Sequence, residues 1–322
     1  MSKAVKISLI VAAVLVALGV VVFVIVMTVN GWNFSENSAV YETNEYEITD
    51  GFDDLAINTE TADIVFLPSA DERCRVICYE RQKMKHSVSV IDGVLTISVD
   101  DQRMWYDHWF SISFKSPKIT VYLPESEYAS LVINESTGSI DIPGGFKFNG
   151  IDISASTGDV NCRASSSGSI KIKLSTGDVL IENLSAKEID VTTSTGRITL
   201  SAVNCDGNVS VNVSTGKVQL TDVRCRNLNS DGSTGTVLLK NVIAVEGFSI
   251  ERSTGDVGFD ACDAAVISVK TDTGDVTGSL LSSKIFITRT DTGKVDVPKT
   301  VSGGVCEITT DTGNIRISIL EA

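Results

Sequence analysis

Three Asp-Thr-Gly tripeptides, which begin at Asp272, Asp291 and Asp311, match the short signature of aspartic proteases. Protease chemistry needs two aspartates that converge and share one proton. In seven other copies along the chain the first position of this tripeptide is serine, so the match follows from an internal repeat. The sequence therefore predicts no aspartic protease.

The repeat aspartates are also candidate metal ligands. If successive copies stack about 4.8 Å apart, Asp272, Asp291 and Asp311 lie above one another. Asp256 and Asp275, each one residue after a repeat glycine, begin a second column. Stacked carboxylates repel one another, and Ca²⁺ prefers oxygen ligands of this kind. The five side chains are therefore either a calcium site or solvated aspartates that cap their own turns. No other cofactor is predicted.

A pair of acidic residues raises the question of polysaccharide cleavage. Asp231 and Glu251 are expected to point outward in adjacent copies, about 5 Å apart, which suits the two carboxylates of a retaining glycosidase. Lys270 and Arg289 continue the same column. A charge ladder of two acidic and two basic residues explains all four positions, and we favour it.

The sequence has one aromatic cluster, which lies outside the repeat. Its candidate partner-binding residues are Trp105, Tyr106, Trp109 and Phe110. Such side chains stack on sugar rings or form the hot spot of a protein interface. They would equally well cover the open end of a repetitive fold, since exposed aromatic patches are rare.

The seven cysteines include no C-x-x-C pair, so the sequence supports neither a zinc ribbon nor a thioredoxin-like redox motif. Cys205 and Cys225 occupy the same column of adjacent copies, within the Cα separation of a disulfide. The sequence leaves open whether these two thiols are bridged or free.

The element that positions these residues is a repeat of 19 or 20 residues. Ser/Asp-Thr-Gly occurs ten times, with glycine at 138, 158, 177, 196, 216, 235, 255, 274, 293 and 313. Apolar residues stand two and four positions after the glycine, and five and seven before it. This spacing predicts two inward-facing strands per coil, joined by a tight turn at the glycine. Coils of this length indicate an all-β parallel solenoid.

The order of segments along the chain follows from this pattern. We predict a cytoplasmic stub at 1–6, a transmembrane signal anchor at 7–29 and a polar stalk at 30–47. An irregular N-terminal cap follows at 48–130, and the regular solenoid fills 131–322. Within the cap, strands are expected at 75–79, 94–99, 111–114 and 119–123.

The predicted anchor is a run of 23 uncharged residues after Lys3 and Lys6. As a helix it would be about 34 Å long, enough to cross a bilayer core. It is too long for the apolar region of a cleaved signal and is not followed by a small-residue cleavage site. The two lysines place the N-terminus in the cytoplasm and the rest of the chain outside the cell membrane.

The charge of the chain limits its partners. The 322 residues have a formal net charge of −14 and only two histidines. A surface this negative repels phosphate backbones, so we exclude nucleic acid. The scarcity of histidine argues against histidine-based catalysis.

The run Ile119-Thr120-Val121-Tyr122-Leu123-Pro124, then Leu131-Val132-Ile133 and the Ser-Thr-Gly-Asp-Val repeats, resembles a bacterial β-strand-repeat family known as "putative adhesin". The resemblance covers about residues 50–320. It implies a right-handed β-helix-like solenoid, anchored in a membrane and associated with envelope stress.

These observations predict a non-catalytic, extracytoplasmic interaction module, adhesin-like or associated with envelope stress. Its partners would be the membrane, through the N-terminal helix, and an unknown protein or envelope polymer. Two alternatives remain, a β-helix polysaccharide-processing enzyme and a calcium-stabilised structural rod. Clustered carboxylate, Arg and Lys side chains in a cleft would favour the enzyme, and the repeat shows ladders instead.

Overall fold

The computed structural model describes residues 3–29, 40–101 and 116–320. The chain divides into two compact units, one formed by Met1–Val40 with Gln102–Lys115 and the other by Tyr41–Asp101 with Ser116–Ala322. In the first unit the described element is helix α1 (Lys3–Val29). A search of the described residues found no helix that is both long and apolar enough to cross a membrane. The anchor predicted at 7–29 is therefore not confirmed.

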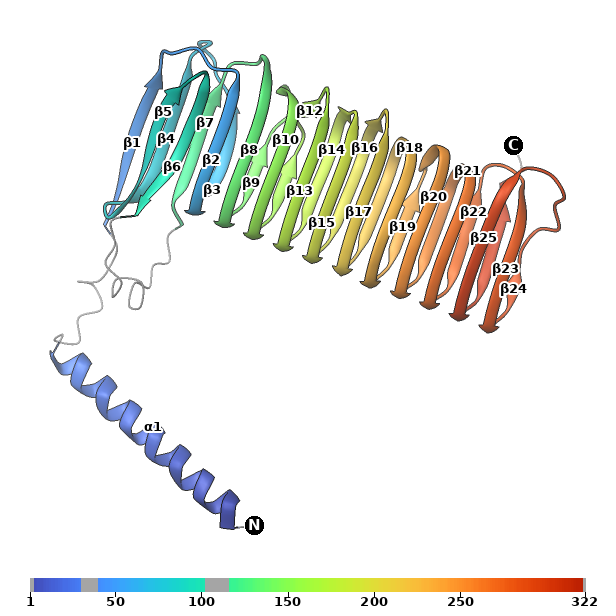
Figure 1. The fold of residues 1–322 in the computed structure, drawn as a ribbon, viewed down its shortest axis with the longest axis horizontal. Coiled ribbons are helices and arrows are strands. Elements are labelled where there is room, and N and C mark those ends of the chain that lie inside the picture. The colour runs from blue at the N-terminus through green and yellow to red at the C-terminus, as the bar shows by residue number, and fades with distance from the viewer. Residues whose placement is uncertain (1–2, 30–39, 102–115, 321–322) are drawn as a thin grey trace. The chain divides into compact units, whose positions relative to one another are not determined.

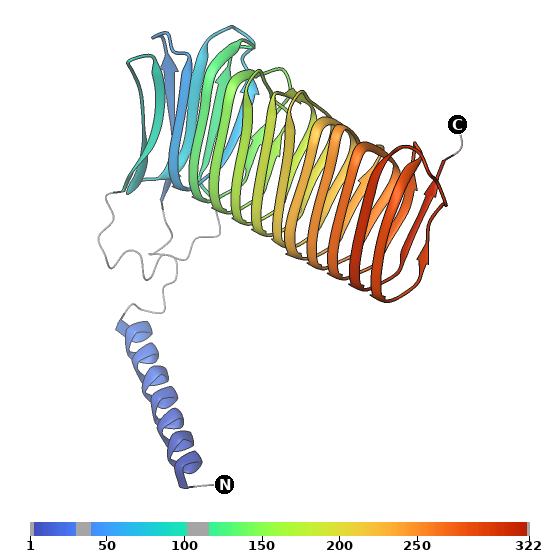
Figure 2. The same cartoon turned by 45° about the vertical axis from the view of Figure 1, so that its right-hand side comes forward.

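The second unit is a parallel β-solenoid, in which coil stacks on coil (Figures 1 and 2). Most coils place one strand before the Thr-Gly turn and one after it. The strands of the regular part are β8 (Glu127–Thr137), β9 (Ile140–Ile142), β10 (Lys147–Thr157), β11 (Val160–Cys162), β12 (Ser165–Ser166), β13 (Ser169–Thr176), β14 (Val179–Ala186), β15 (Glu188–Thr195), β16 (Ile198–Cys205), β17 (Asn208–Thr215), β18 (Val218–Thr234), β19 (Val237–Lys240), β20 (Ile243–Thr254), β21 (Val257–Thr273) and β22 (Val276–Leu280).

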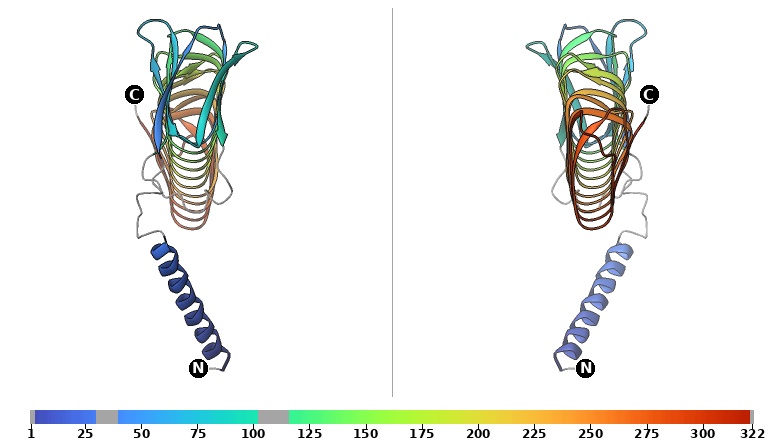
Figure 3. Two further views of the ribbon diagram at one scale, coloured as in Figure 1. Left: turned by 90° about the vertical axis from the view of Figure 1, so that its left-hand side faces the viewer. Right: turned by 90° about the vertical axis from the view of Figure 1, so that its right-hand side faces the viewer.

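The register confirms the columns predicted from the repeat. Val160 pairs with Ile140 on one side and with Val179 on the other, and all three side chains are buried. Seen end on, coils of similar outline lie one behind another, each displaced slightly from the one before (Figure 3). Burial of one such β-branched side chain contributes about 1.5–3 kcal/mol, so the stacked columns supply the core.

The turn glycines allow the coils to approach closely. The backbone N–H of Gly158 donates to the carbonyl of Thr176 in the next coil, at 3.1 Å. Gly158 has φ +135°, and a Cβ there would fall on the carbonyl oxygen of Gly138. Only glycine fits this position, which is why it recurs in every regular coil.

At the N-terminal end the coils stack out of chain order. Strand β2 pairs in parallel with β8 on one side and with β6 on the other, and β3 likewise lies between β9 and β7. Antiparallel β5 and β4 flank β6 and β7, and β1 pairs with β4. The strands are β1 (Tyr41–Ile48), β2 (Asp54–Thr61), β3 (Asp63–Pro68), β4 (Cys74–Arg81), β5 (Met84–Ile91), β6 (Val94–Asp101) and β7 (Lys118–Leu123).

These strands refine the predicted segments. The predicted stalk extends to residue 47, whereas residues 41–48 form β1, because its half-buried side chains pack beside β4. Strands expected at 75–79, 94–99 and 119–123 are present as β4, β6 and β7. The strand expected at 111–114 lies outside the described residues.

At the C-terminal end the coils do not stack in chain order, so the predicted succession of Asp272, Asp291 and Asp311 in one column is wrong. The last strand pair, β25 (Gly304–Thr312) and β26 (Ile315–Ile319), is inserted between two earlier coils. Strand β25 pairs with β21 on one side and with β23 (Lys284–Thr292) on the other, as Figure 1 shows. Strand β26 lies between β22 and β24 (Val295–Asp296) in the same way. The C-terminal strands are therefore flanked on both sides rather than exposed.

Candidate functional site

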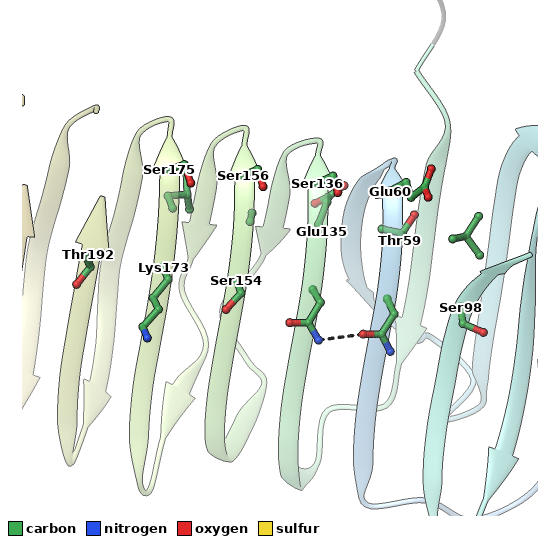
Figure 4. Close-up of a pocket in the computed structure, with 15 residues that line it drawn as sticks. Thr59, Glu60, Ser98, Glu135, Ser136, Ser154, Ser156, Lys173, Ser175 and Thr192 are labelled. Carbon is green, nitrogen blue, oxygen red and sulfur yellow. Dashed lines mark hydrogen bonds between the residues drawn. The ribbon is translucent and has the colours of Figure 1, made fainter. Parts of the chain in front are cut away.

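A shallow, open groove of about 770 Å³ lies on the described solenoid surface. It crosses the face formed by β6, β2, β8, β10, β13 and β15, close to the turn edge (Figure 4). These are neighbouring strands of one continuous ladder. The groove therefore runs along the solenoid axis and crosses the strands.

A row of polar side chains follows the outer face along this groove. Directly paired positions on the six strands supply it, namely Ser98, Asn58, Asn134, Ser154, Lys173 and Thr192. Asn134 donates from Nδ2 to Oδ1 of Asn58 at 2.9 Å, across two coils (Figure 4). Hydroxyl, amide and ammonium groups thus recur at the strand spacing of about 4.8 Å.

Glu135 is a buried carboxyl group in the lining of the groove. Its residue is only 6% exposed, and its Oε1 accepts a hydrogen bond from the backbone N–H of Ala62 at 3.2 Å. In the regular coils the backbone N–H of the turn glycine donates to a threonine carbonyl instead. The other oxygen, Oε2, has no hydrogen-bond partner. Burial raises the pKa of Glu135 to about 7, more than the Ala62 bond lowers it. Near neutral pH this group therefore exchanges a proton, and its Oε2 is buried without a partner.

A buried polar network lies behind the groove. Thr59 lines the groove, and its Oγ1 lies 3.0 Å from Nε2 of His86. The Nδ1 of His86 lies 2.6 Å from Oε2 of Glu80, which also accepts the backbone N–H of His86 at 2.6 Å. Asn44 donates to the other oxygen of Glu80 at 2.6 Å. The network joins β1, β2, β4 and β5 at the N-terminal end of the solenoid.

Cys78 lies beside this network. Its burial, and secondarily the charge of Glu80, raises the pKa of the thiol to about 12. Among the described residues, Cys78, Glu80 and His86 form the one group of three side chains whose ligand atoms lie within 4.8 Å of one another. No sequence motif marks these residues, because they come from the irregular cap and not from the repeat.

The five aspartates predicted as metal ligands do not form such a group. Asp256 accepts the backbone N–H of Asp275 at 2.8 Å, and Asp275 accepts that of Asn314 at 2.7 Å. Asp272 and Asp311 stand in directly paired coils, with Asp291 one coil beyond, where it forms a 3.2 Å ion pair with Arg289. The column that follows the glycine thus caps the backbone of the next coil.

The predicted aromatic cluster belongs to a part of the chain that the structure does not describe. Trp105, Tyr106, Trp109 and Phe110 lie outside the described residues, which end at Asp101 and resume at Ser116. Their proposed role in partner binding stays a prediction.

The charge ladder is confirmed in part. Asp231 pairs with Glu251, and Glu251 pairs with Lys270. The next partner of Lys270 is Thr309 and not Arg289, because β25 is inserted at this point. Cys205 and Cys225 are buried free thiols.

Arg252 is a buried cation that the sequence analysis missed. Its residue is 4% exposed, and Nη2 donates to Oγ of Ser230 at 2.8 Å. Desolvation lowers its pKa. Gly232 leaves the space that the guanidinium occupies. In the coil before Arg252, Ser230 and Gly232 replace the larger side chains that most other coils have at these positions. These two small residues were the signal for Arg252 that the sequence contained.

Comparison with known proteins places the chain in a family. No curated protein matches it. Similar crystal structures include a "putative adhesin" from Bacteroides fragilis NCTC 9343, with 15% identity, TM-score 0.45 and coverage of 88% of this chain and 99% of that one. Another is a "putative adhesin" from Parabacteroides merdae ATCC 43184, with 15% identity, TM-score 0.47 and coverage of 74% and 95%. The family model described as Toastrack DUF4097 matches residues 52–210 and 199–322, which confirms the resemblance seen in the sequence. The chain belongs to the DUF4097 toastrack family.

Proposed function

We propose that this protein is a non-catalytic, extracytoplasmic interaction module that binds an extended envelope polymer along the groove. The observation that supports this most is the row of polar side chains across six paired strands. A ligand that follows this row meets a hydrogen-bonding group at each strand. The relatives named "putative adhesin" suit such a role.

The chemistry of the lining favours a polymer rich in hydroxyl and amide groups. The strands beneath the groove are paired on both sides, so a peptide strand has no free backbone edge to join there. Recognition must therefore use side chains. The net charge of −14 disfavours a polyanion and leaves a neutral polysaccharide as the best match.

The proposal includes attachment of the N-terminal helix to the cell membrane. Its support is the run of 23 uncharged residues at 7–29 that follows Lys3 and Lys6. Extraction of cell membranes with alkaline carbonate tests this attachment. Retention in the pellet supports it, and release into the supernatant would disprove it.

Binding is tested by co-sedimentation of the full chain with purified, insoluble envelope polysaccharide. Wild-type protein should sediment with the polymer, and Asn134→Ala should lower the bound fraction several-fold. Asn229→Ala, on β18 outside the groove, is the matched control and should bind as wild type does. Equal binding by all three proteins, or none, would refute the proposed role of the groove.

A further inference from the structure

The group formed by Cys78, Glu80 and His86 has the composition of a metal site. Cys78 and Glu80 lie on β4, which pairs with β1 and β7, and His86 lies on β5, which pairs with β6. All three side chains are buried, and their ligand atoms lie within 4.8 Å of one another. We propose that these residues bind a divalent transition-metal ion of the zinc class. The inference does not depend on the function proposed for the groove.

Sulfur, imidazole nitrogen and carboxylate oxygen together select a metal. A borderline-soft ion such as Zn²⁺ accepts all three ligand types, whereas Ca²⁺ and Mg²⁺ prefer oxygen alone. Three protein ligands leave one position of a tetrahedral ion for water or a further ligand. The side chains therefore fit zinc better than the calcium considered for the repeat aspartates.

Neighbouring groups already orient the ligands. Thr59 Oγ1 lies 3.0 Å from Nε2 of His86 and partners that ring nitrogen. The other ring nitrogen, Nδ1, faces Glu80 and is the one that would bind the metal. Asn44 donates to Oε1 of Glu80 at 2.6 Å, and the hydroxyl of Tyr46 donates to the carbonyl of His86 at 2.9 Å. Metal-binding histidines and carboxylates in proteins are held by outer hydrogen bonds of this kind.

Charge balance favours the same conclusion. A thiolate, a carboxylate and a neutral imidazole carry two negative charges, which a divalent ion neutralises. A neutral site is what a buried location requires, since an uncompensated charge there is costly. Binding releases the thiol proton of Cys78 to solvent, so that the Sγ lone pair forms the metal bond.

The ion would connect the two faces of the solenoid at its N-terminal end. Strand β4 continues the ladder of β7 and β3, whereas β5 continues that of β6 and β2. The backbones of β4 and β5 pair at Arg81 and Met84, and Glu80 and His86 join them through side-chain contacts (Figure 1). A bound metal would add a coordinate link between these faces to the existing contacts. We therefore expect it to raise the melting temperature of the full chain.

The test uses Co²⁺ as a spectroscopic probe of the full-length protein after treatment with a chelator. Wild-type protein should bind a single ion per chain and show thiolate-to-cobalt charge-transfer absorption, which Zn²⁺ then abolishes. Cys78→Ser should lose this absorption. Thr59→Val should keep it but bind about 10–100-fold more weakly. Cys74→Ser is the control, because Cys74 is a buried thiol on the same strand outside the group.

Two results would overturn the proposal. One is the absence of charge-transfer absorption from folded wild-type protein at saturating Co²⁺. The other is an equal loss of absorption in Cys74→Ser and Cys78→Ser. The wild-type measurement alone decides whether the metal site exists, even if a variant fails to fold. Glu80 and His86 would then be a structural polar pair only.

Discussion

Thr312 pairs directly with Thr273, although a complete coil separates the two residues in the sequence. Thr292, from that intervening coil, pairs with the other side of Thr312. The coil of β23 thus precedes the final strand pair in the sequence but lies outside it in the stack. The N-terminal end has the same feature, since β2 lies between β6 and β8. Out-of-order stacking thus flanks β2 and β3 at one end, and β25 and β26 at the other, with strands on both sides.

Hydrogen exchange should reveal this arrangement. Strand β25 has a partner on each side, whereas β23 pairs with β25 alone among the described strands. Ile308 is fully buried, and Ile287 is 54% exposed. Amides of residues 307–310 should therefore exchange more slowly than those of residues 287–290. Slower exchange in β23 would indicate stacking in chain order.

Substitution of a turn glycine should be strongly destabilising. Gly158→Ala places a methyl group on the Gly138 carbonyl at φ +135°, so we expect a loss of about 2–4 kcal/mol in the free energy of unfolding. Gly150→Ala is the control, because a Cβ there has no atom within 4 Å. Denaturant unfolding measures both, and a similar loss in the two variants would contradict the account.

The pKa of Glu135 predicts a pH dependence of stability. The carboxyl ionises near pH 4.5 in the unfolded chain and near pH 7 in the folded one. The free energy of unfolding should therefore fall as pH rises from about 4.5 to about 7, by roughly 1–3 kcal/mol at about 1.4 kcal/mol per pKa unit.

Glu135→Gln should remove that part of the pH dependence and keep the acceptor for Ala62. Urea unfolding at several pH values compares the variant with wild type. Parallel profiles for the two proteins would show that Glu135 ionises normally in the folded state.

The aspartates that directly follow the turn glycines should stabilise the solenoid without a bound metal ion. Asp256→Ala removes the acceptor of the Asp275 N–H and should cost about 1 kcal/mol. Asp256→Asn should cost little, since Asn314 already accepts the backbone N–H of Lys294 through its Oδ1. Unfolding with Ca²⁺ and with a chelator should give equal stabilities. A calcium-dependent loss in Asp256→Asn would favour the calcium-stabilised rod.

The repeat predicted the regular coils because their columns have distinct chemistry. Val160, between Ile140 and Val179, follows directly from the spacing around the glycines. The order of the last coils does not follow from it. Val276 is paired with Ile315, and Val295 two positions after Gly293 would have filled the same apolar position. Equivalent columns cannot specify which coil stacks on which.

The candidate sites depended on departures from the repeat. Glu135 and Arg252 occupy the same repeat position, where most other coils have apolar residues or threonine, so a column alignment contains the signal. Glu80 and His86 cannot be aligned with any repeat column, because β4 and β5 run antiparallel to the solenoid strands. Their pairing depends on tertiary contacts between two faces of the cap, which spacing does not encode.

The central claim, that the groove contacts the partner, is tested most directly by photo-crosslinking in living cells. A photoreactive residue at Ser154 lies within the groove, and one at Ser249 lies on an exposed position of β20 outside it. The account predicts that position 154 captures envelope polysaccharide and position 249 does not. Equal capture from both positions, or capture from 249 alone, would contradict it.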